Sequence, residues 1–252
     1  ILADAYHKGL VANVTTLGLN FTRDSIEALK RYCGAVALSL EATDSEFKKR
    51  RSSGFYRFKK SLNTLLANDI PAVLQVVVSA ENIDDIAGVV EFAADYPDLY
   101  GVIFLAYKPV GRGERFDTPL TEVSNKKLYS VLKSAFYELS KFTRVGYDCC
   151  LSPGIGLLEK DFGFSRKEPI EGCSAMRGSV GIMSDLTVAP CTFTTHIPQG
   201  HLSEHTLEEI WGSRQSMGFR QSFQNRVSQN SSCRSCHRNS TCLGGCPAYD
   251  LV

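Results

Sequence analysis

The residues with the clearest metal-binding chemistry lie near the C-terminal end of the sequence. The stretch CRSCHRNSTCLGGCP, from Cys233 to Pro247, contains four cysteines. Four thiols this close together can form two disulfides, bind a zinc ion or ligate an iron–sulfur cluster. The spacing is C-x2-C-x5-C-x3-C followed by proline. It favours iron–sulfur over zinc, because zinc sites usually pair two short knuckles and the spacer of the second pair is too long for one.

Two further cysteines extend this array upstream. Cys173 is followed by Cys191 in GIMSDLTVAPCTF, a pattern typical of a β-hairpin with its turn near Ser184 and Asp185. The net charge of +1 gives no indication of nucleic acid or an anionic membrane as a partner, and no apolar run has the length of a membrane-spanning helix. We therefore expect a cytoplasmic, reducing location, in which clustered cysteines favour a metal site over disulfides.

The first 150 residues alternate between apolar strands and amphipathic helices. The expected strands are 11–17, 35–40, 72–78, 100–107 and 143–148, and the expected helices are 1–8, 24–32, 57–67, 83–96 and 124–140. Asp24 and Glu27 are placed like a capping box at the start of the second helix. Apolar strands that alternate with helices predict βα units and a buried parallel sheet, with the chemistry at the carboxyl ends of the strands.

A connection rich in Gly and Pro separates this region from the cysteines. We expect a βα domain over residues 1–150, a linker over 151–172 and a small cysteine-rich domain over 173–252. In the last of these, Thr206 and Glu209 predict a capping box that opens a short helix, with Trp211 as a packing anchor.

The six cysteines in this order resemble the SPASM domain, the auxiliary iron–sulfur domain of many radical S-adenosylmethionine enzymes. The resemblance covers Cys173–Asp250. It implies that one auxiliary 4Fe–4S cluster is ligated by Cys173, Cys191 and Cys246, and that three irons of a second are held by Cys233, Cys236 and Cys242. The family usually takes the fourth ligand of the second cluster from a later cysteine, which this sequence lacks, and has glycine where Leu186 stands.

Three cysteines lie outside this pattern. Cys149 and Cys150 follow the last expected strand, and either is a candidate for the fourth ligand of the first cluster or a buried free thiol. Cys33 is expected to belong to the core.

The same resemblance makes residues 1–150 similar to the back portion of the radical enzyme core, an α/β fold that forms a partial (βα)6 barrel of the TIM type. It implies that Ser39, Glu41 and Asn82 contact S-adenosylmethionine, and that Arg112 in KPVGRG lines the pocket. The C-x3-C-x2-C motif that holds the catalytic 4Fe–4S cluster is absent from the sequence. We therefore expect a fragment, cut at both ends, whose first strands and catalytic cluster lie upstream. The alternative is a degenerate relative that never does the chemistry, and no catalytic residue is assigned.

For the intact enzyme, the resemblance implies reductive cleavage of S-adenosylmethionine to a 5′-deoxyadenosyl radical that modifies a peptide or protein, as in a peptide maturase. The electrons would come from a donor such as flavodoxin or ferredoxin. Sulfatase maturation is disfavoured, because those enzymes have an acidic residue where Thr192 stands. Two other functions stay open: a non-catalytic iron–sulfur module for electron transfer or binding, and a βα binding domain with a zinc-stabilised tail.

Overall fold

The chain divides into two compact units in the computed structural model, which describes residues 1–40, 54–115, 120, 123–151, 155 and 172–249. Unit 1 comprises Ile1–Tyr107 and Thr118–Asp148, and unit 2 comprises Lys108–Asp117 and Cys149–Val252. Among the described helices, none is both long enough and apolar enough to cross a membrane.

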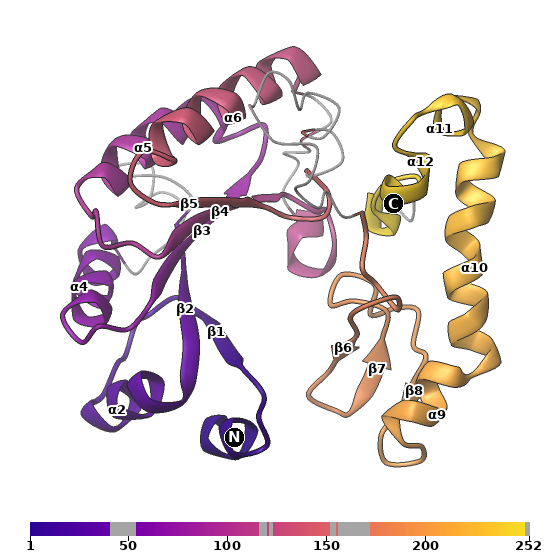
Figure 1. Ribbon diagram of the computed structural model, residues 1–252, viewed down its shortest axis with the longest axis horizontal. Helices are drawn as coiled ribbons and strands as arrows, with labels where there is room; N and C mark the ends of the chain where they lie inside the picture. The colour runs from indigo at the N-terminus through magenta and orange to yellow at the C-terminus, as the bar shows by residue number, and fades with distance from the viewer. Residues whose placement is uncertain (41–53, 116–119, 121–122, 152–154, 156–171, 250–252) are drawn as a thin grey trace. The chain divides into compact units, whose positions relative to one another are not determined.

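Unit 1 is built on one parallel sheet of five strands, paired in chain order. The strands are β1 (Ala12–Thr16), β2 (Cys33–Ser39), β3 (Ala72–Val78), β4 (Gly101–Ala106) and β5 (Arg144–Tyr147). Each strand pairs in parallel with the next along the chain. The sheet curves like an arc of a barrel (Figure 1), so the α/β fold that the sequence predicts is confirmed.

Helices cover the convex face of this sheet (Figure 1). They are α1 (Leu2–His7), α2 (Arg23–Tyr32), α4 (Phe55–Leu66), α5 (Ile86–Ala94) and α6 (Asn125–Leu139), with the 3-10 turn η1 (Ile83–Asp85) before α5. Leu74 of β3 is fully buried, as are Leu62 of α4 and Val89 of α5. Burial of these apolar faces is the main stabilising contribution to the βα layer, at about 25 cal/mol for each Å² removed from water.

The N-terminal cap of α2 differs from the expected one. The hydroxyl of Thr22 accepts a hydrogen bond from the Ser25 N–H at 3.2 Å, and the Ser25 hydroxyl accepts one from the Thr22 N–H at 2.9 Å. The predicted box of Asp24 and Glu27 is therefore wrong. Thr22 has the extended backbone that an N-cap requires, whereas Asp24 lies in the first turn, where its charge complements the helix dipole.

Unit 2 consists of a small antiparallel sheet and a series of helices. Its described elements are η2 (Gly111–Arg115), β6 (Gly181–Ile182), β7 (Thr187–Ala189), β8 (Gly200–His201), α9 (Leu207–Gly212), α10 (Arg214–Gln229), α11 (Ser231–Ser235), α12 (Asn239–Cys242) and η4 (Pro247–Tyr249). The hairpin of β6 and β7 and the capping box of Thr206 and Glu209 are confirmed. Trp211 packs half-buried beside the fully buried Ile210.

Candidate functional site

Cys191 lies in a tight turn directly after β7. Thr194 closes this turn, because its hydroxyl accepts the Cys191 N–H at 3.2 Å and its own N–H donates to the Cys191 carbonyl at 3.1 Å. The Phe193 N–H donates to Cys191 Sγ at 3.2 Å. A backbone N–H directed at the sulfur stabilises negative charge there, which suits a thiolate ligand.

Cys173 lies in a second turn, which is tied to the first one. The Met176 N–H donates to the carbonyl of Pro190, the residue before Cys191, at 3.3 Å. Arg177 donates to the Cys173 carbonyl at 3.1 Å. Cys173 is buried in a small apolar cluster, against which Cys191 packs. The two cysteines that the sequence separates by a hairpin are therefore neighbours in the fold.

In the C-x2-C part of the C-terminal run, Cys233 lies within α11 and Cys236 is its C-cap residue. The Asn230 side chain caps this helix by accepting the Cys233 N–H at 3.1 Å. The Cys236 N–H donates to the Cys233 carbonyl at 3.2 Å, and Cys236 Sγ accepts the Arg238 N–H at 3.4 Å. Both thiols are half-buried, as is that of Cys242.

The C-x3-C part forms a left-handed loop between Cys242 and Cys246. The intervening residues Leu243, Gly244 and Gly245 have φ angles of 58°, 82° and 88°. Glycine adopts such angles without steric cost, which explains the two glycines. This loop leads from the half-buried Cys242 to Cys246, which is only 9% exposed.

Four thiols meet in unit 2. The Cys149 sulfur is hydrogen-bonded to Cys150 and to Cys173. These two bonds, of which the one with Cys150 has the larger effect, lower the pKa of Cys149 to about 3, although burial alone would raise it. The corresponding bond to Cys149, with burial, raises the pKa of Cys173. A hydrogen bond with Cys150 lowers the pKa of Cys246. The fold therefore brings together cysteines from three separate parts of the chain.

This thiol group, defined as Cys149, Cys150, Cys173 and Cys246 with Cys191 beside it, fits an iron–sulfur cluster by its donor chemistry. Thiolates are the ligands that such clusters use, and a group of buried and half-buried thiols matches that preference. Within the described ranges, no three His, Cys, Asp or Glu side chains are arranged to hold a single metal ion.

The residues expected to contact S-adenosylmethionine have different positions in unit 1. Ser39 is the last residue of β2 and is half-buried. Asn82 is 1% exposed, and its amide closes the turn after β3 by accepting the Ser79 N–H at 2.8 Å and donating to the Val77 carbonyl at 2.6 Å. Glu41 lies outside the described residues, and so does the side chain of Arg112. The roles of these four residues stay predictions.

Sequence reasoning missed two cations beside the thiol group. Lys108, from the KPVGRG stretch, is only 8% exposed, and its charge acts on both Cys149 and Cys246. Arg226 of α10 donates to the carbonyls of Gly244 and Gly245 at 3.2 and 3.4 Å. A lysine next to proline, as in Lys108-Pro109, is typical of an exposed turn, and only the tertiary fold shows that Lys108 is buried.

The comparisons with known proteins agree with this geometry. Residues 173–237 match the family described as "SPASM: Iron-sulfur cluster-binding domain". The chain is 24% identical over 263 residues to the PqqA peptide cyclase of Ruegeria pomeroyi, covering 98% of this chain and 65% of that protein.

Two groups of solved structures share the fold. Streptococcus suis SuiB bound to its precursor peptide SuiA superimposes with a TM-score of 0.77 at 18% identity, covering 99% of this chain and 58% of SuiB. The enzyme anSMEcpe with bound AdoMet and a peptide superimposes with a TM-score of 0.67 at 18% identity, covering 96% of this chain and 68% of the other.

The chain thus spans 65% of the length of the cyclase and 58% of the length of SuiB. The SPASM match lies on the segment that holds Cys173, Cys191, Cys233 and Cys236, and the fold of the chain is shared with anSMEcpe. Residues 173–237 therefore match the SPASM iron–sulfur family, and the chain as a whole is similar to a peptide cyclase and shares its fold with SuiB and anSMEcpe.

Proposed function

We propose that this chain is part of a radical S-adenosylmethionine enzyme that modifies a peptide or protein, and that its SPASM domain binds auxiliary 4Fe–4S clusters. The observation that carries the proposal is the thiol group, in which Cys173 and Cys246 meet through Cys149 and Cys150. When bound, the clusters supply one-electron redox chemistry, and S-adenosylmethionine is the source of the radical.

The ligand assignment follows the same contacts. Cys173, Cys191 and Cys246 hold the first auxiliary cluster, since they are buried or half-buried and lie together. Cys233, Cys236 and Cys242 provide three ligands for a second, since all three lie on α11, α12 or the link between them. The N–H groups of Phe193 and Arg238 then stabilise one sulfur in each set.

A peptide is the substrate class that the relatives support. The curated relative is named for its action on the peptide PqqA, and SuiB and anSMEcpe were each solved with a peptide bound. Thr192, the residue after Cys191, is exposed and carries no acid–base group. The chemistry at this position therefore differs from the acidic residue that sulfatase maturation requires, which favours another kind of peptide modification.

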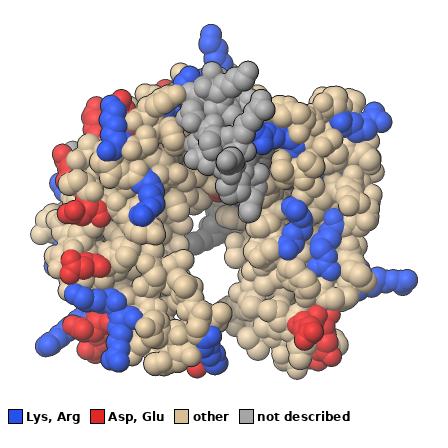
Figure 2. Space-filling model, in the orientation of Figure 1, with Lys and Arg blue, Asp and Glu red and all other residues tan. Residues whose placement is uncertain are grey.

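An acidic electron donor of the flavodoxin or ferredoxin class suits the charge of unit 2. Residues 210–249 contain five arginines and no Asp or Glu. Figure 2 shows Lys and Arg side chains spread over this face of unit 2, with acidic side chains gathered at one end. Complementary charge accelerates association with a partner of opposite sign and is weakened by salt.

The cluster assignment is tested by purifying the chain anaerobically and counting iron, acid-labile sulfide and zinc. We expect about four iron and four sulfide for each cluster bound, and loss of one cluster in Cys173→Ala and in Cys191→Ala. About one zinc with no sulfide, even after anaerobic reconstitution, would overturn the assignment. Peptide modification is tested separately on the intact enzyme that contains the C-x3-C-x2-C motif, by the mass change of peptides incubated with it, S-adenosylmethionine and dithionite. Formation of 5′-deoxyadenosine with no change in the peptide, either in mass or in the configuration of its residues, would contradict a peptide substrate.

A further inference from the structure

Lys108 is a buried cation at the edge of the thiol group. It follows β4 by two positions but belongs to unit 2, and its side chain is 8% exposed. Its ammonium nitrogen lies 4.4 Å from the centroid of the Phe193 ring, a distance at which the ring face attracts a cation. A buried ammonium is costly unless negative charge or hydrogen-bond acceptors surround it.

Some of the groups near Lys108 belong to the first auxiliary cluster site of the proposed function. Phe193, over which the ammonium lies, donates its N–H to Cys191 Sγ. Lys108 is also close enough to Cys149 and Cys246 for its positive charge to act on both sulfurs. Lys108 thus interacts with three cysteines of this site. It contacts the ring of Phe193, which is hydrogen-bonded to Cys191, and its charge acts on Cys149 and Cys246.

We propose that the positive charge of Lys108 raises the reduction potential of the first auxiliary cluster. The inference rests on the proposed function, because it requires that a cluster be bound there. Reduction adds one electron, supplied by a reductant that is itself oxidised, and no bond is formed or broken. A cation held beside the cluster in a poorly solvated site stabilises the more negative, reduced form more than the oxidised form.

The experiment is an EPR-monitored redox titration with dithionite of the reconstituted chain. Cys173→Ala identifies the signal of the first cluster by its loss. Lys108→Met keeps an unbranched side chain, one atom shorter, and removes the charge. In this variant we expect the equilibrium constant for reduction of the first cluster to fall by about tenfold, which lowers its potential by about 59 mV for one electron. Lys108→Arg retains the charge and should keep the wild-type potential.

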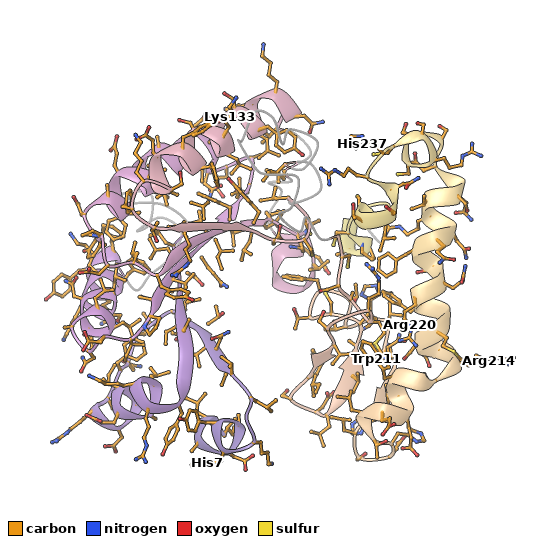
Figure 3. All side chains as sticks on the ribbon, viewed as in Figure 1. His7, Lys133, Trp211, Arg214, Arg220 and His237 are labelled. Atoms are coloured by element: carbon orange, nitrogen blue, oxygen red, sulfur yellow. The ribbon has the colours of Figure 1, made fainter. Side chains whose placement is uncertain are left out.

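Arg214 provides the matched control. It is an exposed cation at the start of α10, and Figure 3 shows its side chain directed outward from the helix. Along the helix it lies about 18 Å from Arg226, which contacts the cysteine loop. Because exposed charges are screened over about 10 Å, Arg214→Met should leave the potential unchanged.

The possible outcomes separate a failure of the Lys108 inference from a failure of the proposed function. A wild-type chain that binds no cluster contradicts the proposed function. A wild-type cluster whose potential is the same in Lys108→Met, or shifts equally in Lys108→Met and Lys108→Arg, overturns the inference alone. If Lys108→Met assembles no first cluster, retention in Lys108→Arg supports a role for the charge, and loss in both variants contradicts it.

Discussion

A β-carbon at Gly172 would lie 2.1 Å from the backbone oxygen of Thr241. No side chain fits at that distance, so the residue before Cys173 packs directly against the backbone just before Cys242. This contact connects the beginning of the SPASM domain to its last cysteines. It therefore helps to place Cys173 within reach of Cys246.

The first prediction follows from this contact. In Gly172→Ala the two backbone segments must separate, so we expect unit 2 to be destabilised by about 2 kcal/mol and the iron content of the first cluster to fall. Thermal unfolding followed by circular dichroism, with iron counted per chain, measures both effects.

Gly178→Ala is the control for Gly172→Ala. Gly178 belongs to the same turn region, and a β-carbon there would meet no atom within 4 Å. Its φ angle is outside the left-handed region, so alanine is tolerated. Equal losses in the two variants would show that the close approach to Thr241 has no special role.

The second prediction concerns the clamp that Arg226 forms on the left-handed loop. Its guanidinium holds the carbonyls of Gly244 and Gly245, which lie directly before Cys246. Hydrogen bonds to a charged group contribute about 1.5 to 3 kcal/mol, and we expect Arg226→Gln to lose a value in this range and to loosen the position of Cys246.

The measurement for Arg226 is a denaturant titration of the reconstituted chain, with the cluster absorbance followed in parallel. Arg226→Lys keeps the charge but not the two-pronged geometry, so it should recover only part of the stability. Arg214→Gln, at the exposed end of the same helix, should change neither quantity by more than about 0.5 kcal/mol. Full recovery in Arg226→Lys would contradict a geometric clamp.

The sheet of unit 1 could be predicted closely because its strands are apolar along their length. The expected strand over 72–78 has the same bounds as β3, since an apolar run between polar helices fits a buried parallel strand. The cap of α2 could not be fixed, because Thr22 and Asp24 both suit an N-cap and only the backbone angles separate them.

The elements around the cysteines were harder to predict. The sixteen residues of α10 bury only Ser216 and Phe223, so its apolar stripe is too thin to give a helical period. The spacing of the cysteines indicated a metal-binding array, but for Cys149 and Cys150 the sequence left two possibilities open, a cluster ligand or a buried free thiol. Their contact with Cys173 and Cys246 depends on long-range packing, which the sequence does not show. Figure 3 shows Arg220 of α10 beside Trp211 of α9, a contact between two consecutive helices.

The third prediction assigns the fourth ligand of the first cluster. Cys149 is hydrogen-bonded to Cys173 and interacts with the charge of Cys246, so it is linked to two of the proposed ligands. We expect Cys149→Ser to reduce the iron bound at this site at least severalfold, because a serine oxygen is a poorer ligand for iron–sulfur clusters.

Cys150→Ser distinguishes the two neighbouring thiols. We expect this variant to keep its full iron content, with a change in the EPR line shape of the first cluster, because Cys150 is hydrogen-bonded to both Cys149 and Cys246. The reverse result, with loss of iron in Cys150→Ser and retention in Cys149→Ser, would assign the ligand to Cys150 instead.

The fourth prediction concerns Leu186, the residue that stands where the family usually has glycine. Its φ angle is 72°, in the left-handed region that costs an ordinary residue about 1 to 2 kcal/mol. It lies in the turn between β6 and β7, where its N–H donates to the Met183 carbonyl and its carbonyl accepts from Leu202. The side chain is 46% exposed, so its removal loses little buried area.

Leu186→Gly should therefore stabilise unit 2 by about 1 kcal/mol, because glycine adopts this angle without steric cost. Glycine also increases the freedom of the unfolded chain, which reduces the gain but does not reverse it when the native φ is positive. Leu186→Ala keeps the strained backbone and loses only the side chain, so it should be neutral or slightly destabilising. Chemical denaturation of the three proteins measures the difference. A Leu186→Gly variant no more stable than Leu186→Ala would show that the hydrogen bonds of the turn, and not the strain at this residue, determine the stability of the hairpin that leads to Cys191.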